Sequence, residues 1–168
     1  MLPWLRPNEF ADSLFKINFE RLYKTGFRAI ILDIDDTLVP KHVNEIYPAV
    51  IDFIESLKSI GFKICLTSNN RHPLRVEYIG KNLGLPFSSL SLKPLPMAFD
   101  KALATLDAKP EETLVIGDQL FTDILGGNIK KLYTIFVEPM TKETFFLRQW
   151  MRGIEEWLIS RWQGEEDN

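Results

Sequence analysis

Five short apolar runs divide the chain and predict five strands. Residues 28–32, Arg28-Ala29-Ile30-Ile31-Leu32, are almost entirely apolar, as expected for a strand that is buried on both faces of a parallel sheet. A partly polar run at Ser88–Leu92 predicts a shorter strand. The other three predicted strands are Phe62–Leu66, Thr113–Ile116 and Tyr133–Val137.

Stretches with helical features separate these runs. Proline begins and glycine ends two of them, at Pro48–Gly61 and Pro73–Gly84, which are favoured positions for these residues. Alternating strands and helices favour parallel pairing through right-handed crossovers. We therefore expect one α/β domain over residues 1–168, with a doubly wound parallel sheet of five core strands. Further helices are predicted at Met97–Leu106, near Asp123 and, as a C-terminal amphipathic helix, at 141–163.

Composition narrows the class of protein. A chain of 168 residues can bury a sizeable core, and a net charge of −3 argues against a dedicated nucleic-acid binder. The apolar run Ala29–Leu32 is far too short to span a bilayer, and the N-terminus lacks the order of charged and apolar residues of a secretory signal. The single cysteine, Cys65, lies in an apolar run and is expected to be a buried, inert thiol. We expect a cytoplasmic protein.

Acidic residues follow two of the predicted strands directly. Asp33, Asp35 and Asp36 follow the first strand, and Asp118 and Asp123 follow the fourth. Any one of these residues is equally well explained as a helix cap or turn residue. Two acidic clusters that each end an apolar strand instead indicate a shared site, because ligands bind beyond the carboxyl ends of strands in such sheets. Crowded carboxylates need a cation, and Mg²⁺ suits an oxygen-rich site that also holds phosphate.

Polar residues after the second and third strands complete the predicted crevice. Ser68 and Asn69 lie just before the helix that begins at Pro73, where a hydroxyl and free backbone N–H groups form a cradle for an anion. Lys93 follows the third strand and can offset negative charge in the crevice. Taken alone, such a lysine is more often a solvated surface residue.

In their order, these segments resemble the four motifs of the haloacid dehalogenase (HAD) superfamily. Each motif ends a predicted strand, and the resemblance extends from Ala29 to Val137. It implies a HAD-like, Rossmannoid fold and a phosphatase activity. The matching segments are Asp33-Ile34-Asp35-Asp36-Thr37-Leu38 (DxDx[TV]), Leu66-Thr67-Ser68, Lys93, and Gly117-Asp118-Gln119-Leu120-Phe121-Thr122-Asp123 (GDxxxTD).

The resemblance also implies a role for each matching residue. Asp33 would be the nucleophile that forms an aspartyl-phosphate, and a ligand of Mg²⁺ together with Asp118. Asp35 would bind the metal through its backbone carbonyl and serve first as general acid and then as general base. Ser68 and Asn69 would bind the phosphoryl group, and Lys93 would neutralise its charge. Asp123 would orient Lys93 or a metal-bound water, and Thr37 would brace the first loop.

Finer features resemble one subgroup. Ser68-Asn69-Asn70, Arg75-Val76 and the segment 117–128 resemble the YqeG-type phosphatases of HAD subfamily IIIA, which are related to mitochondrial phosphatidylglycerophosphatase. That relation implies phosphatidylglycerophosphate as a substrate. The chain departs from the usual pattern at Asp36, where Gly or Asn is more common. We expect this extra carboxylate to affect the metal site.

The spacing of the motifs leaves no room for a cap domain. One helix and a flap fit between Thr37 and Ser68, and one helix and a short strand fit between Ser68 and Lys93. An open crevice suits a bulky substrate, such as a phospholipid head group, a phosphoprotein or a nucleic-acid end, or else a cap from a neighbouring subunit of a homo-oligomer. We interpret His42 and His72 as ordinary exposed loop residues rather than substrate contacts.

The predicted C-terminal helix has one apolar face flanked by arginines. Core packing is the simpler interpretation of this face. Its tryptophans and arginines also suit peripheral contact with a membrane. The face comprises Phe146, Leu147, Trp150, Met151, Ile154, Trp157 and Leu158, and the flanking residues are Arg148, Arg152 and Arg161.

Three other functions fit parts of the pattern. The first is a phosphatase for small metabolites that acts as a tetramer. The second is a receiver-like module that accepts phosphate without turning it over; Asp35, placed two residues after the predicted nucleophile, favours turnover instead. The third is a scaffold that keeps an active-looking site within a larger assembly.

Overall fold

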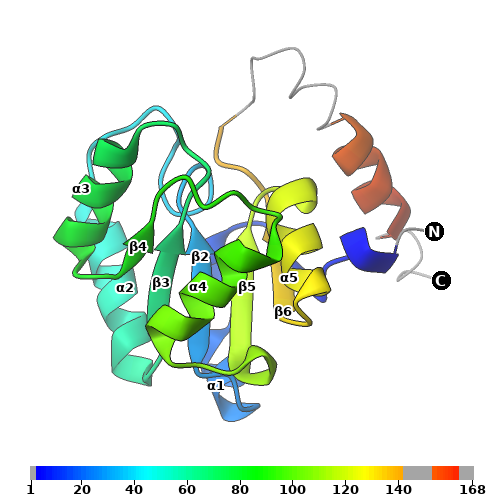
Figure 1. The fold of residues 1–168 in the computed structure, drawn as a ribbon, viewed down its shortest axis with the longest axis horizontal. Helices are drawn as coiled ribbons and strands as arrows, with labels where there is room; N and C mark the ends of the chain where they lie inside the picture. Colours follow the sequence, from blue (N-terminus) through cyan, green and yellow to red (C-terminus); the bar gives the residue numbers. More distant parts are fainter. Residues whose placement is uncertain (1–2, 142–152, 163–168) are drawn as a thin grey trace.

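A six-stranded parallel sheet forms the centre of the protein, with helices on both faces (Figure 1). The computed structural model describes residues 3–141 and 153–162. The strand order is β1-β6-β5-β2-β3-β4: from β2 the chain adds β3 and β4 on one side and then β5 and β6 on the other. The predicted switch point therefore lies between β2 and β5. The strands are β1 (Glu9–Ala11), β2 (Ala29–Asp33), β3 (Lys63–Thr67), β4 (Phe87–Ser88), β5 (Thr113–Gly117) and β6 (Tyr133–Val137).

The helices cover the two faces of this sheet. The α-helices are α1 (Phe19–Lys24), α2 (Pro48–Ile60), α3 (Pro73–Leu83), α4 (Pro96–Leu106) and α5 (Leu125–Ile129). Short 3-10 turns are η1 (Pro3–Leu5), η2 (Leu14–Lys16) and η3 (Pro110–Glu112), and η4 (Leu120–Ile124) is a turn of π-helix. Residues 153–162 are also helical.

Strand β2 shows why the central strands are apolar at every position. Its residues Ile30 and Leu32 belong to the core that contains α1, α2 and α3, whereas Ala29 and Ile31 pack in the core that contains α4. Because both faces are covered, all five residues of β2 are buried. Cys65 on β3 is buried as expected, and burial raises the pKa of its thiol to about 11.

Two strands differ from the prediction. Strand β1 was not predicted, because Glu9-Phe10-Ala11 forms no apolar run and pairs only with β6 at the edge of the sheet. The third strand is Phe87–Ser88 rather than Ser88–Leu92. It ends early because Leu90 and Leu92 adopt left-handed backbone conformations, with φ of 48° and 61°, which turn the chain away from the sheet. Within residues 3–141 no cap domain interrupts the fold, as predicted.

The described part of the C-terminal helix packs on the domain. Leu158 and Trp162 are buried in a cluster with Leu5 and Phe136 beside η4. Trp157 points away and is 59% exposed. Core packing therefore accounts for this part, while the predicted apolar residues Phe146, Leu147, Trp150 and Met151 lie outside the described residues. No described helix has the length and apolar character needed to cross a membrane.

Candidate active site

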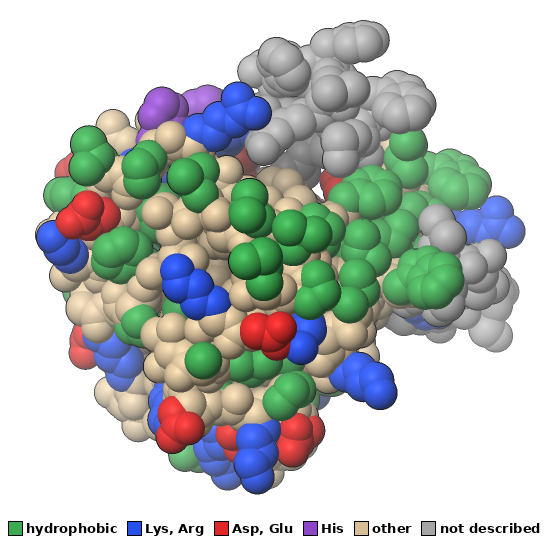
Figure 2. All heavy atoms as spheres, viewed as in Figure 1, with side chains coloured by type: hydrophobic (Ala, Val, Ile, Leu, Met, Phe, Trp, Pro, Cys, Tyr) green, Lys and Arg blue, Asp and Glu red, His purple; other side chains and the backbone are tan. Residues whose placement is uncertain are grey.

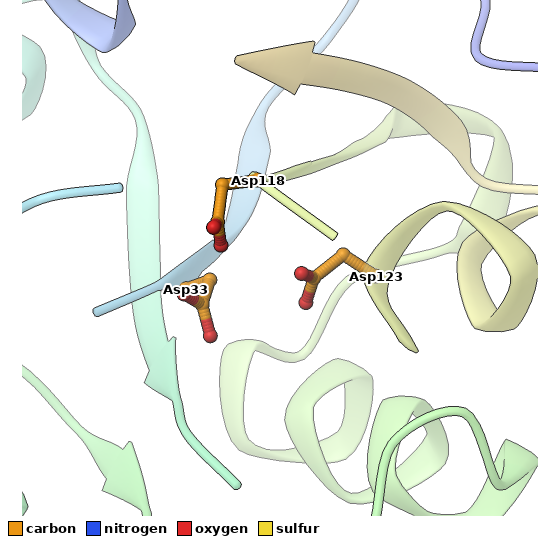
Figure 3. A group of neighbouring side chains, drawn as sticks. All are labelled: Asp33, Asp118 and Asp123. Atoms are coloured by element: carbon orange, nitrogen blue, oxygen red, sulfur yellow. The ribbon is translucent and has the colours of Figure 1, made fainter. Parts of the chain in front are cut away.

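Three buried carboxylates meet at the switch point of the sheet (Figure 3). Asp33 is the last residue of β2, Asp118 directly follows β5, and Asp123 lies in η4. One oxygen from each carboxylate lies within 4.8 Å of the others. The adjacent ends of β2 and β5 thus bring together residues that are far apart in the sequence, as predicted from the acidic strand ends.

The π-turn η4 and Gly117 together place Asp123. A Cβ atom on Gly117 would lie only 2.3 Å from the Cγ atom of Asp123, so any larger residue would push this carboxylate away. Single π-turns are rare in helices and occur frequently at functional sites. The glycine of the fourth motif is therefore required by the close approach of a side chain.

Lys93 lies between two of the carboxylates. Its Nζ atom is 2.6 Å from Oδ1 of Asp33 and 2.6 Å from Oδ1 of Asp123, and all three side chains are buried. The predicted orientation of Lys93 by Asp123 has the required geometry. Lys93 is thus part of a buried ionic network and not the solvated surface residue that the sequence alone also allowed.

Asn69 holds the backbone of Lys93. The Nδ2 group of Asn69 donates to the carbonyl oxygen of Lys93 at 2.8 Å, and Oδ1 of Asn69 accepts from the N–H of Lys93 at 2.9 Å. Asn69 also lines the cavity, but its amide is engaged with the protein. Substrate binding by Asn69 stays a prediction, and the positioning of Lys93 is a role that sequence reasoning missed.

Burial and charge shift the proton affinities of this network. Burial raises the pKa of Asp33 to about 7, because Lys93 offsets only part of the lost solvation and Asp123 adds repulsion. Burial alone would lower the pKa of Lys93, yet the carboxylates of Asp123 and Asp33 raise it above its usual value. Lys93 is consequently held as a cation beside the predicted nucleophile.

The acidic group fits a hard divalent cation. Oδ2 of Asp33 is buried and has no hydrogen-bond partner within the described part of the chain. A buried carboxylate oxygen without a partner is costly unless a cation or substrate contacts it. Thr37 donates a hydrogen bond to Oδ1 of Asp118 at 3.4 Å and so connects the loop after β2 to the second predicted ligand. These oxygens are the donor set that Mg²⁺ prefers.

Asp36 has a structural role, and its expected effect on the metal site stays a prediction. Its φ of 62° lies in the left-handed region, which explains why Gly or Asn is favoured at such a position. Its Oδ1 accepts from the N–H of Lys41 at 3.2 Å and from the hydroxyl of Thr141 at 2.5 Å. The carboxylate thus stabilises the loop that follows β2, and it is not a member of the group formed by Asp33, Asp118 and Asp123.

Asp35 is held by donors from the next strand and helix. Its Oδ2 accepts from the hydroxyl of Ser68 at 3.2 Å and from Nδ2 of Asn70 at 2.8 Å, and its Oδ1 pairs with Nη1 of Arg75 on α3. The Nη2 group of Arg75 donates to the carbonyl oxygens of Pro40 at 3.1 Å and Val43 at 2.9 Å. Arg75 therefore ties the predicted general acid to the loop after β2, a role that the resemblance at Arg75-Val76 did not specify.

A cavity of about 450 Å³ opens over these residues. Asp33, Asp35, Ser68 and Lys93 line it, as predicted. Its other lining residues include the basic and histidine side chains Lys41, His42, Arg71 and His72. Both histidines are exposed, as expected, but they lie at this cavity rather than at an unrelated part of the surface.

Known proteins of similar sequence are hydrolases and phosphatases. The family model for haloacid dehalogenase-like hydrolases matches residues 42–128, a segment that contains Ser68, Lys93 and Asp118 and begins after Asp33. The chain is 36% identical over 154 residues to a Bacillus subtilis protein named "Probable phosphatase YqeG", covering 92% of this chain and 89% of that protein. It is 26% identical to phosphatidylglycerophosphate phosphatase 1, chloroplastic/mitochondrial, of Arabidopsis thaliana, covering 93% of this chain and 47% of that protein.

Solved structures show the same fold. The HAD-hydrolase YfnB from Bacillus subtilis, bound to magnesium, superposes with a TM-score of 0.55 at 16% identity, covering 71% of this chain and 90% of that one. The cobalt-bound deoxy-D-mannose-octulosonate 8-phosphate phosphatase from Haemophilus influenzae gives a TM-score of 0.54 at 16% identity, covering 67% of this chain and 68% of that one. At these identities, the similarity concerns the architecture of the sheet and its helices.

Proposed function

The chain belongs to the haloacid dehalogenase-like hydrolases and is a phosphatase, and we propose that it cleaves phosphomonoesters with Mg²⁺ through an aspartyl-phosphate on Asp33. The observation that carries this proposal is the state of the Asp33 carboxylate. One oxygen is fixed by Lys93, while the other is buried and has no partner within the described residues. A carboxylate held in this way is oriented for attack on a group that enters the cavity.

The residues of the site divide the reaction into two steps. In the first, a carboxylate oxygen of Asp33 bonds to phosphorus, the ester P–O bond breaks, and Asp35 gives a proton to the departing oxygen. In the second, water attacks the phosphorus of the aspartyl-phosphate, Asp35 accepts a proton from the water, and the bond to Asp33 breaks to release phosphate. Asp35 lines the same cavity as Asp33, which supports the proposal that Asp33 is the nucleophile and Asp35 transfers the protons.

Ser68 and Lys93 are proposed to hold the transferring group. Both are buried and both line the cavity, so their donors meet a phosphoryl group away from bulk water. We assign the metal to the carboxylates of Asp33 and Asp118 with the backbone carbonyl of Asp35, and one oxygen of Asp123 lies close to the same place. When bound, Mg²⁺ would supply positive charge that lets an anionic nucleophile approach an anionic substrate.

A large phosphomonoester, such as phosphatidylglycerophosphate, is the proposed substrate. The fold has no cap domain within residues 3–141, and an open cavity encloses little of a small ligand. The Arabidopsis relative is named for phosphatidylglycerophosphate, which supports the same choice. With this substrate, the protein would work in the cytoplasm at the inner face of the membrane.

The test is a substrate panel with purified protein. We expect turnover of p-nitrophenyl phosphate with Mg²⁺, loss of turnover on chelation, and a higher kcat/KM for phosphatidylglycerophosphate in mixed micelles than for sugar, nucleotide or peptide phosphates. Full activity without divalent metal would contradict the mechanism. A preference for a sugar phosphate would leave the mechanism in place and overturn the substrate.

A further inference from the structure

An exposed apolar loop lies next to the candidate active site. Between β4 and α4 and at the start of α4, the large apolar side chains face solvent, with exposed fractions of 51% for Leu90, 56% for Leu92, 49% for Leu95 and 62% for Met97. Figure 2 shows hydrophobic side chains gathered over this part of the surface. We call these four residues the leucine loop. Single exposed apolar residues are ordinary, but a contiguous group marks a contact surface.

Two of these leucines occupy backbone conformations that disfavour leucine. Leu90 and Leu92 have φ of 48° and 61°, in the left-handed region where Gly, Asn and Asp are the usual residues. Their side chains gain little from the core, because both are more than half exposed. Folding alone therefore does not explain leucine at either position, whereas an apolar contact outside the chain does.

Hydrogen bonds join the leucine loop to the rim of the cavity. Between the two leucines, the N–H of Ser91 donates to the carbonyl oxygen of Ser68 at 3.0 Å. Lys93 directly follows Leu92 in the chain, and its backbone is held by Asn69. The segment after β3 continues into Arg71 and His72, which line the cavity. The leucine loop thus adjoins the basic rim of the cavity, by which we mean Lys41 and Arg71.

We propose that the leucine loop docks on an anionic lipid bilayer, with the basic rim of the cavity against the head groups. An apolar loop next to a cavity that is lined by Lys41 and Arg71 matches the boundary between acyl chains and anionic head groups. Asp100 on α4 is neutralised by Lys130 at 2.5 Å, so it does not oppose this charge pattern. In this arrangement the membrane contacts the leucine loop and not the described part of the C-terminal helix, where Leu158 and Trp162 face the core.

A bilayer fits this surface better than a second protein does. A protein that covered the leucine loop and the adjoining rim would close the cavity to its substrate. A bilayer covers the same surface and also delivers its own phosphomonoesters to the cavity. The inference thus rests on the proposed lipid substrate, but docking is measurable without turnover.

The test compares vesicle binding by the wild-type protein and by the double variant Leu90→Asn, Leu92→Asn. Asparagine tolerates the left-handed conformation better than leucine, so the variant should fold at least as stably as the wild type. We expect about a tenfold or greater loss of binding to vesicles of phosphatidylglycerol and phosphatidylcholine, because two apolar anchors are removed. The same variant should lose turnover of vesicle-bound phosphatidylglycerophosphate and keep turnover of p-nitrophenyl phosphate.

A matched control is Ile129→Asn. Ile129 is 51% exposed, as the leucines are, but it ends α5, which leads away from the site towards the start of β6. This variant should bind vesicles like the wild type. Arg71→Gln should weaken binding to anionic vesicles and leave the weaker binding to phosphatidylcholine alone unchanged.

Three outcomes decide the proposal. Equal vesicle binding by the wild type and the leucine double variant would overturn it. So would a wild type that ignores vesicles and forms dimers which the double variant abolishes, because the loop would then be occupied by a second copy. Vesicle binding that depends on the leucines, in a protein without Mg²⁺-dependent p-nitrophenyl phosphate activity, would support docking and overturn the proposed function alone.

Discussion

The floor and the mouth of the cavity are built in different ways. On the floor, Asp33, Lys93 and Asp123 are buried and fixed by one another at 2.6 Å. At the mouth, His42 and Arg71 lie in loops and are exposed. The floor is attached to strand ends and a π-turn, so its charges are oriented before a substrate arrives. The contrast is between charged groups that the fold fixes in place and side chains that remain accessible to solvent.

Arg75 connects these two regions. Its guanidinium contacts Asp35 at the cavity and the backbone of Pro40 and Val43 in the loop after β2. Its Nε atom is buried and makes no hydrogen bond within the described residues. Ser68, Asn70 and Arg75 all donate to the Asp35 carboxylate, which fixes its orientation at the cavity.

The largest expected effect separates a floor aspartate from a surface one. Asp33→Asn should lower kcat for p-nitrophenyl phosphate by about 10⁴-fold or more, the scale of removing a nucleophile. Asp12→Asn is the control, because Asp12 forms an exposed ion pair with Lys16. Steady-state kinetics and trapping of the phosphoenzyme measure the difference. Near-normal turnover by Asp33→Asn would place the nucleophile elsewhere.

The second effect concerns the stability of the floor. Lys93→Met removes the cation between two buried carboxylates and should lower the free energy of unfolding by about 3 kcal/mol or more without metal. Lys81→Met changes an exposed pair with Glu77 and should alter it by less than about 1 kcal/mol. Guanidinium unfolding in the presence of chelator measures both. Equal stability of the two variants would mean that the buried network adds nothing to folding.

The third effect tests the link made by Arg75. Arg75→Gln should slow hydrolysis of an alkyl phosphate by about 10–100-fold, because Asp35 loses its orientation and proton transfer to the leaving oxygen suffers. p-Nitrophenyl phosphate should be affected less in kcat, since its leaving group needs little protonation. Arg75→Lys should restore part of the difference.

The control for Arg75 is Arg21→Gln, which removes an exposed pair with Glu9. If Arg75→Gln slowed both substrates equally and also lowered the melting temperature, Arg75 would serve only to anchor the loop after β2. A leaving-group dependence at unchanged melting temperature requires an effect on Asp35.

The fourth effect tests the close packing of the fourth motif. Gly117→Ala places a Cβ atom 2.3 Å from Cγ of Asp123 and should shift this carboxylate away from Lys93. We expect a loss of about tenfold in kcat/KM, on the scale of one weakened electrostatic contact. Gly153→Ala, where a Cβ atom meets nothing within 4 Å, should leave kinetics unchanged. Equal activity of both variants would show that the position of Asp123 is not critical.

The smallest effect concerns Asp36. Asp36→Asn keeps a residue that tolerates φ of 62° and retains an oxygen for the N–H of Lys41. Metal affinity, measured by calorimetry, and kcat should change by less than about threefold, which corresponds to less than about 0.7 kcal/mol. A large loss of metal affinity would make Asp36 part of the metal site after all.

The sequence predicted the floor better than the mouth. Strand β2 and Asp33 were predictable, because a strand buried on both faces is apolar throughout and its acidic residues stand out at its end. The pairing of Arg75 with Asp35 was not, since α3 carries Arg75 towards the cavity only once the chain has folded. Strand β1 lacks an apolar run, and the left-handed turn at Leu90 has none of the residues that usually signal one.

The two ends of the sheet have a consequence for handling the protein. The edge strands β1 and β4 have only three and two residues, so little unpaired backbone is available for another chain to extend the sheet. Strand β6, which β1 covers, has five residues and is largely apolar. Removing the segment up to Ala11 would uncover this longer strand. Such a truncated protein should aggregate through added β-structure even if its catalytic residues were untouched.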